Sequence, residues 1–185
     1  MKSLLLILIL TLNFQSLTKA DDIRDFEIEG MSIGESALKY FSKSELKSNK
    51  QNWYKKNNYS TSTINGINIS YKTNDKKYLI EALETGEFID IDKCLEKLPK
   101  EFNSLKDIFG TNIEITGPTR TNHWADKSNN SWYEGYYFEF PNKETISIEC
   151  YNWSDEITLK EGWEDNLRFI IRTNEFNDFL LSQNK

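Results

Sequence analysis

Residues able to carry out catalysis are few in this chain of 185 residues. His123 is the single histidine, and Cys94 and Cys150 are the two cysteines, so the usual zinc sites with several His or Cys ligands are excluded. A Cys–His pair would need an exposed thiolate, whereas both cysteines stand among apolar residues. The sequence has no G-x-S-x-G motif for a serine nucleophile. We therefore assign no catalytic, cofactor-binding or metal-ligating residue from the sequence.

Carboxylates are the one abundant group with catalytic potential, and several crowd the segment after Trp153. They are Asp155, Glu156, Glu161, Glu164 and Asp165. Oxygen ligands of this kind suit Ca²⁺, but their spacing does not match the D-x-[DN]-x-[DN]-G loop. We therefore expect a solvated acidic loop over 155–165, and whether it binds a cation stays open. A hydrolase with carboxylate catalysis around residues 153–165 is the alternative function.

A second group of functional candidates lies on three segments with alternating apolar residues, at 132–140, 145–153 and 167–172. Such alternation is typical of an antiparallel sheet that has one face against a core. The opposite side would carry aromatic residues and arginines, which are enriched in protein interfaces. We predict a protein-binding surface made of Tyr133, Tyr137, Tyr151, Trp153, Arg168 and Arg172.

The alternative for this outer face is a purely structural role. Its tyrosines would then shelter the sheet, and Glu139 or Glu149 would pair with Arg168 or Arg172 across neighbouring strands. The two alternatives differ in what a truncation costs, because an interface residue mainly affects binding and a structural residue mainly affects folding.

A long helix must lie against the apolar side of these strands. The apolar residues at 95, 98, 102, 105 and 109 recur at steps of three and four, which predicts an amphipathic helix. Asp92 can cap its start and Gly110 its end. Pro99 lacks a backbone donor, so we expect a kink or a break there.

The two cysteines fall on the surfaces that this packing brings together. Cys150 shares the apolar side of its strand with Ile146 and Ile148, and Cys94 borders the apolar stripe of the helix. In an oxidising compartment such a pair usually forms a disulfide, which would stabilise the fold by roughly 4 kcal/mol for a loop of this length. Two buried free thiols are the alternative.

The first half of the chain predicts shorter elements. S-x-x-E capping boxes at 32–35 and 42–45 each predict the start of a helix, the first running through Phe41. Residues typical of β-structure follow over 59–84, with a tight turn at Asn65-Gly66, and predict two or three antiparallel strands.

These elements predict one α+β domain over residues 21–185, an antiparallel sheet with helices packed on one face. Ile113 and Ile115 indicate a further short strand, and residues 175–181 a closing helix. Residues 42–62, rich in Lys, Asn and Ser, form the segment that we expect to be loosest.

The N-terminus has the three parts of a cleavable signal peptide. Lys2 precedes an apolar run over Leu4–Leu12, and Thr18 and Ala20 supply small residues before the cleavage point. The apolar run is about half as long as the roughly 20 residues of a membrane-spanning helix. We predict that residues 1–20 are removed, that no membrane anchor remains, and that the protein is periplasmic or secreted.

Charge narrows the choice of partners. Removal of Lys2 and Lys19 would leave 21 basic residues against 29 acidic ones, a net charge near −8. Such a surface repels phosphate backbones and anionic lipids, so we expect no nucleic-acid partner.

The N-terminal part of the mature chain resembles a known group of proteins. The stretch D-F-E-I-E-G-M-S-I-G-E-S at 25–36 is similar to the opening of small exported proteins from AT-rich marine bacteria, as are N-D-K-K-Y at 74–78 and Cys94 before the helix. The group has no assigned activity, so the resemblance implies no functional residue. Gly30-Met31-Ser32 is similar to the start of small periplasmic domains of the outer-membrane-assembly and β-lactamase-inhibitor type, which bind other proteins.

The function predicted from the sequence is non-enzymatic protein binding through the aromatic outer sheet face, without a cofactor. A flat aromatic face would favour protein binding, whereas a buried carboxylate pair beside a pocket would favour an enzyme.

Overall fold

The structure is a computed structural model that describes residues 20, 22–51, 53, 54, 56, 58–109 and 111–183. The predicted signal peptide at 1–20, apart from Ala20, and the predicted mature start at Asp21 lie outside the described residues. The coarse fold class is as predicted, because one compact domain combines an antiparallel sheet with helices.

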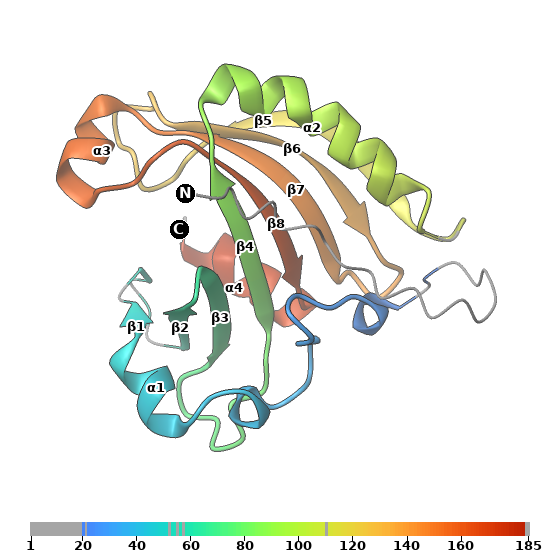
Figure 1. The fold of residues 1–185 in the computed structure, drawn as a ribbon, viewed down its shortest axis with the longest axis vertical. Helices are drawn as coiled ribbons and strands as arrows, with labels where there is room; N and C mark the ends of the chain where they lie inside the picture. Colours follow the sequence, from blue (N-terminus) through green and yellow to red (C-terminus); the bar gives the residue numbers. More distant parts are fainter. Residues whose placement is uncertain are drawn as a thin grey trace, which may run out of the picture.

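The eight strands within the described residues belong to one antiparallel sheet with the order β1-β2-β3-β4-β8-β7-β6-β5. The strands are β1 (Lys50–Gln51), β2 (Tyr59–Ile64), β3 (Ile67–Lys72), β4 (Ala82–Phe88), β5 (Glu114–Asn122), β6 (Trp132–Glu139), β7 (Thr145–Asn152) and β8 (Asn166–Arg172). Figure 1 shows β1–β3 turned away from the layer of β5–β8, so the sheet is strongly twisted and its two ends face different directions. The sheet therefore has a convex and a concave side.

Local sequence signals account for the hairpins. Asn65 and Gly66 both have positive φ, at 53° and 81°, which is the backbone of a tight turn between β2 and β3. β5 is longer than the short strand predicted at Ile113 and Ile115, and its pairing with β6 shifts register between Thr116 and Thr119. The irregularity includes Pro118, which cannot donate to the ladder.

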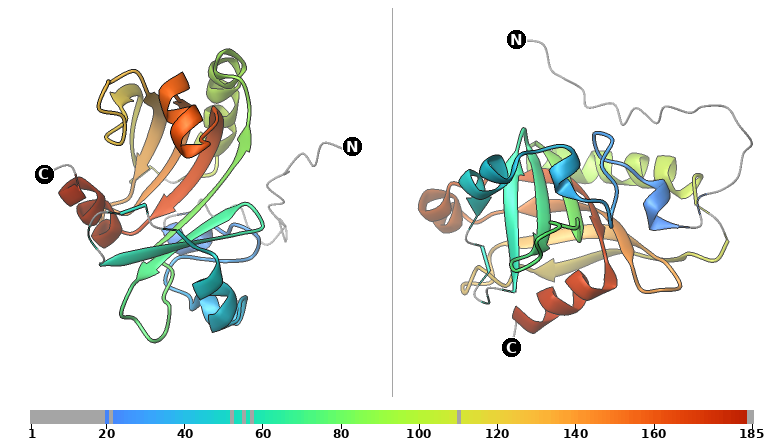
Figure 2. Two further views of the ribbon diagram at one scale, coloured as in Figure 1. Left: turned by 90° about the vertical axis from the view of Figure 1, so that its left-hand side faces the viewer. Right: turned by 90° about the horizontal axis from the view of Figure 1, so that it is seen from below.

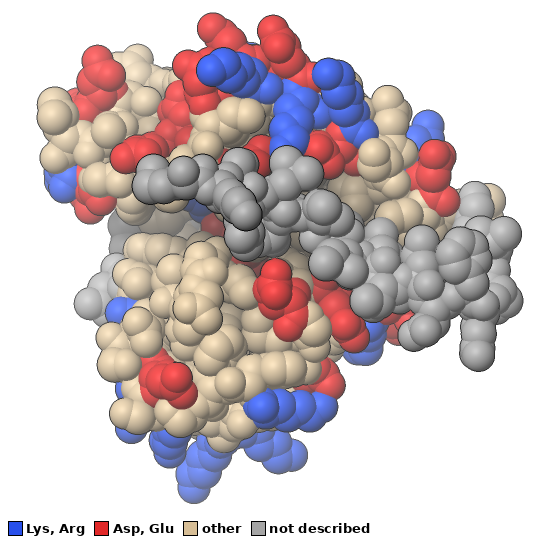
Figure 3. Space-filling view, in the orientation of Figure 1, with Lys and Arg blue, Asp and Glu red and all other residues tan. Residues whose placement is uncertain are grey.

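Helix α2 (Ile91–Lys106) packs against β7 and β8 and closes one face of the sheet. Asp90 caps its start in place of the predicted Asp92, and the predicted end at Gly110 lies outside the described residues. The helix runs through Pro99 without the predicted break. Acidic and basic side chains lie side by side over α2 in the space-filling view (Figure 3). Among the ion pairs of this helix, Lys97 pairs with Glu87 of β4 and with Glu101.

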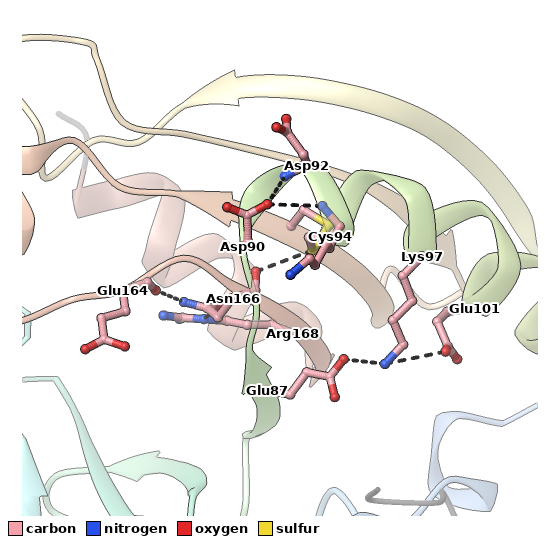
Figure 4. Close-up of a disulfide and its surroundings, with 11 residues drawn as sticks. Glu87, Asp90, Asp92, Cys94, Lys97, Glu101, Glu164, Asn166 and Arg168 are labelled. Carbon is pink, nitrogen blue, oxygen red and sulfur yellow. Dashed lines mark hydrogen bonds and ion pairs between the residues drawn. A yellow bond between two sulfur atoms is a disulfide. The ribbon is translucent and has the colours of Figure 1, made fainter. Parts of the chain in front are cut away.

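Cys94 and Cys150 lie at disulfide distance, as the predicted pairing requires, and Figure 4 shows the bond at Cys94. Their Sγ atoms are 1.95 Å apart and their Cα atoms 5.9 Å apart. Cys94 is in the first turns of α2, and Cys150 is on β7 beside Leu167 of β8. Both side chains are fully buried. The bond therefore attaches the N-terminal end of α2 directly to the centre of the sheet.

Two predicted helix starts had different outcomes. Ser42 and Glu45 form the complete capping box of α1 (Lys43–Ser48), as predicted. The box at 32–35 starts no α-helix, and only the 3-10 helix η2 (Ala37–Lys39) follows. Here the backbone bonds elsewhere, since Gly34 N–H donates to the Ile80 carbonyl and Ile80 N–H donates to the Glu35 carbonyl, both at 2.8 Å. Pairing with a distant segment therefore overrides the local signal.

The predicted acidic loop at 155–165 is wrong over its first half, which forms helix α3 (Asp155–Glu161). Ser154 caps it by accepting from Ile157 N–H, and Gly162 ends it in the left-handed conformation. The predicted closing helix is present as α4 (Asn174–Gln183). The segment 42–62 comprises α1, β1 and part of β2, with residues 52, 55 and 57 outside the described set.

The helices do not share one face of the sheet, which corrects that detail of the prediction. α2 covers the face with Ile146, Ile148 and Cys150. In contrast, Ile157 of α3 clusters with Tyr151 and Trp153, and two phenylalanines of α4 cluster with Tyr59 and Ala82. The residues that α3 and α4 contact therefore lie on the sheet face opposite α2 or at the ends of that face. Figure 2 shows α3 and α4 far apart, with the open face between them.

Candidate functional site

The face of β6–β8 opposite α2 is the wall of a cavity of about 530 Å³. Successive side chains of a strand alternate between faces, so the residues that flank the buried Phe138, Ile148 and Ile171 lie on the cavity side of the sheet. All six residues of the predicted binding surface line it: Tyr133, Tyr137, Tyr151, Trp153, Arg168 and Arg172. The structure thus brings the predicted residues together, on a concave surface rather than a flat one.

Stacked aromatic rings form one end of the cavity. The ring centroids of Tyr133 and Tyr151 are 5.3 Å apart, and those of Tyr151 and Trp153 are 5.7 Å apart, in stacked arrangements. Trp163, just after α3, approaches Trp153 to 4.6 Å. His123 lies 4.4 Å from Trp153 in an edge-on arrangement. These rings present flat apolar surface together with a few polar atoms at their edges.

His123 is held as a neutral group in this aromatic end. Burial, aided by the nearby positive charge of Arg168, lowers the pKa of His123 to about 4. Its Nδ1 accepts a hydrogen bond from Ala125 N–H at 3.2 Å. An acceptor at Nδ1 places the ring proton on Nε2. The imidazole therefore contributes an uncharged polar ring to the cavity at neutral pH.

Asp126 fixes the loop that carries His123. Its carboxylate accepts hydrogen bonds from the backbone N–H and the hydroxyl of both Ser128 and Ser131. It also accepts one from the hydroxyl of Ser154 at 3.0 Å. These bonds hold the pKa of Asp126 well below its usual range. Because Ser154 caps α3, the carboxylate joins the His123 loop to the start of that helix.

The middle of the cavity contains a satisfied ion pair. Arg168 Nη1 donates to Glu84 Oε1 at 2.7 Å, and Arg168 Nε donates to Asn166 Oδ1 at 2.7 Å. Asn68 Nδ2 donates to the same Glu84 oxygen at 2.9 Å. The guanidinium also lies over the Tyr151 ring, 4.3 Å from its centroid. This network joins β3, β4 and β8 across the floor.

Glu149 is the second carboxylate of the floor, and unlike Glu84 it is buried. It is 1% exposed, and its two oxygens accept from Ser147 Oγ at 2.7 Å and from Tyr151 OH at 2.6 Å. Gly135 on the adjacent strand leaves room for it, because a Cβ there would come within 2.7 Å of Glu149 Cγ. Burial and the Glu149 charge together raise the pKa of the Tyr137 hydroxyl. The structural alternative thus holds in part, because Glu149 Oε1 forms an ion pair with Arg172 Nη1 at 3.9 Å, one of the pairs that it predicted.

Several cavity residues were not identified from the sequence. Asn68, Ser70, Ala82 and Glu84 reach the site because β4 pairs with β8, and Phe176 and Leu180 reach it from α4. His123, Trp124 and Trp163 come from loops. The alternation of polar residues in β3 and β4 was a usable signal for the floor, but no local pattern shows which strand lies beside β8.

The acidic residues after Trp153 do not form a common site. Asp155, Glu156 and Glu161 are exposed on α3, while Asp165 accepts from Trp153 N–H at 2.8 Å. Among the residues that the structure describes, no group of three or more His, Cys, Asp or Glu side chains is arranged to hold a metal ion. Of these acidic residues, Glu164 lines the cavity.

Comparisons with known proteins identify no relative. No family model matches the chain, and neither a curated protein nor a solved structure is significantly similar to it. The function must therefore be argued from the site.

Proposed function

We propose that the protein is a non-enzymatic binding domain whose ligand site is the aromatic cavity on the concave face of the sheet. The observation that carries this proposal is the cavity itself, whose volume of about 530 Å³ is within the range typical of small-molecule sites. Its stacked aromatic end and its few buried polar groups are also characteristic of such sites. An organic ligand with a flat apolar part fits this combination best.

The sequence predicted a protein partner for this face, and one observation keeps that as the second candidate. Phe88 at the end of β4 and Leu181 on α4 line the cavity yet are 77% and 66% exposed. Exposed apolar groups beside a cavity are common where another molecule docks. A partner that inserts a side chain into the cavity and covers its edge would use both features.

The arrangement of the carboxylates favours binding over catalysis. Both oxygens of Glu149 accept hydrogen bonds from hydroxyl groups, and Glu84 pairs with Arg168. A general acid or base needs access to the reacting atoms of its substrate. The hydrolase alternative around 153–165 stays a prediction, and its acidic residues on α3 point to solvent rather than into the cavity.

A fragment-binding experiment tests the proposed function. A panel of small aromatic compounds, titrated by ligand-detected NMR, should include members that bind wild-type protein, and Trp163→Ala should weaken their binding at least about tenfold by removing one wall of the site. Trp132→Ala is the matched control, since Trp132 is half-buried under Arg120 outside the cavity. Absence of binding across the panel, or equal losses in both variants, would refute the proposal.

We also propose that the domain is exported. The Cys94–Cys150 pair supports an oxidising compartment, and no described helix is long and apolar enough to cross a membrane. The finer prediction is a periplasmic or secreted protein whose mature chain starts at Asp21. N-terminal sequencing of the native protein tests it, and a mature chain that begins at Met1 would contradict it.

A further inference from the structure

The hydrogen-bonding groups of the cavity are unequally satisfied. Glu84 and the buried Glu149 already accept from four side chains, namely Asn68, Arg168, Ser147 and Tyr151. Two donor groups on the cavity wall, in contrast, have hydrogen-bonding capacity that no described residue uses. They belong to Arg172 and Trp153.

Arg172 has the largest unused capacity. A guanidinium carries five N–H donors, yet Arg172 makes no hydrogen bond with any residue that the structure describes. It forms an ion pair with Glu149, whose Oε1 lies 3.9 Å from Nη1, a distance too long for a hydrogen bond. The side chain is 17% exposed, and it lines the cavity. Arg168 differs, because its guanidinium is already bonded to Glu84 and Asn166.

Trp153 supplies a second unused donor. The residue is 7% exposed and lines the cavity, and its Nε1–H is buried without an acceptor among the described residues. The nitrogen itself has almost no accessible surface, so a ligand in the cavity meets Trp153 through the face of its ring. Trp153 directly follows the end of β7, whereas Arg172 of β8 pairs with Thr145 at the start of β7. A ligand could therefore meet Trp153 through an apolar body and Arg172 through a terminal group.

Resting on the proposed function, we propose that the cavity selects organic carboxylates with a flat aromatic body, and that Arg172 binds the carboxylate. A guanidinium and a carboxylate match in charge and in the spacing of two parallel hydrogen bonds. The aromatic end formed by Tyr151, Trp153 and Trp163 receives the body of the ligand by ring stacking. Glu84, Glu149 and Glu164 line the cavity together with the two arginines, so the selectivity arises at Arg172, where a cationic end group can neither accept a hydrogen bond nor form an ion pair.

Three probes with one ring system and different end groups test this selectivity. They are indole-3-propionate, its neutral amide indole-3-propionamide, and the cation tryptamine, each titrated at pH 7 against the disulfide-containing protein. We expect the carboxylate to bind about tenfold to a hundredfold more tightly than the amide, as is typical of charge-assisted hydrogen bonds, and tryptamine to bind most weakly.

Substitutions then assign the preference to one residue. Arg172→Met should bring the affinity ratio of carboxylate to amide close to one, and Arg172→Lys should retain part of it. Arg120→Met, which removes an exposed arginine of β5 outside the cavity, should leave the ratio unchanged. The readout is a ratio of affinities within one variant, so it is independent of partial unfolding. If Arg172→Met does not fold, Arg172→Lys and the wild-type ratio still decide.

The outcomes separate this inference from the proposed function. Equal affinities for carboxylate and amide, with Trp163→Ala still weakening both, would overturn the carboxylate selectivity and leave the binding site intact. An unchanged preference in Arg172→Met would overturn the role of Arg172. Failure of all three probes and of the aromatic panel to bind would remove the proposed function together with the inference.

Discussion

On the α2 side of strands β6–β8, Phe138, Ile146 and Ile171 are fully buried, whereas on the opposite side Tyr137 and Arg172 line a cavity. The same strands build both faces, so the difference lies in what covers them. α2 runs along one face and is attached to it by the disulfide. α3 and α4 contact only the ends of the other face. A sheet face that a helix covers along its length thus becomes part of the core. A face that helices contact only at its ends is left open as a possible site.

The largest expected effect comes from the covered face. Phe138 stacks on Phe109 with ring centroids 4.3 Å apart, so Phe138→Ala should lower the free energy of unfolding by about 3–5 kcal/mol through the cavity that it leaves. Tyr133→Ala on the same strand but the open face should cost about 1 kcal/mol. Urea denaturation of both variants measures the contrast, and equal losses would show that the two faces do not differ.

The second prediction concerns the attachment of α2. Replacing both cysteines (Cys94→Ala with Cys150→Ala) should lower the free energy of unfolding by about 4 kcal/mol, because the bond closes a long loop, with a sequence separation of 56. Treating wild-type protein with a reductant should give a similar loss. Peptide mapping without reductant checks the bond itself, and two freely alkylated thiols in native protein would contradict it.

The third prediction uses His123 at the aromatic end of the open face. Its pKa in the folded protein is about 4, below the ordinary value near 6.5, so the unfolded chain binds the proton more readily between these values. Stability should therefore fall by up to about 3 kcal/mol as pH drops from about 6.5 to about 4. His123→Phe should remove that part of the pH dependence and leave the part due to carboxylates. A variant with the same slope as wild type over this window would show that His123 is not buried in this way.

The smallest effect is expected at the orphan donor. Trp153→Phe keeps most of the ring stack but removes the unpaired Nε1–H, so it should change the free energy of unfolding by less than about 1 kcal/mol and could raise it. Trp153→Ala, which empties the same space, should cost about 3–5 kcal/mol. Thermal and urea unfolding of the pair test this. A large loss in Trp153→Phe would mean that the N–H has an acceptor.

Much of this comparison could be predicted from sequence, because strand alternation and helix periodicity are local. The period-two pattern at 145–153 predicted that Cys150 faces the core and Tyr151 the outer side of the sheet. The apolar stripe of α2 predicted that Cys94 faces the same core layer as Cys150, and both cysteines are buried. The concavity could not be predicted in this way. It depends on β4 pairing with β8, which joins residues such as Ala82 and Arg172 that lie far apart in the chain.

Two local signals were misinterpreted for identifiable reasons. Ser154 followed by Asp155 and Glu156 is a helix start with acidic residues in the first turn, but the density of charge suggested a loop. Conversely, the box at Ser32 and Glu35 did not form a helix, because its backbone pairs with Ile80. The first error could have been avoided from the sequence alone, whereas the second required knowledge of a distant contact.

Asp126 has a consequence for how the cavity can change shape. It bonds the loop of His123 to Ser154 at the start of α3, and α3 leads directly to Trp163. The positions of His123 and Trp163, which both line the cavity, therefore depend on the same carboxylate. Asp126 itself does not line the cavity. The width of the aromatic end is set from outside it, and a substitution at Asp126 would alter what fits there without removing any group that a ligand touches.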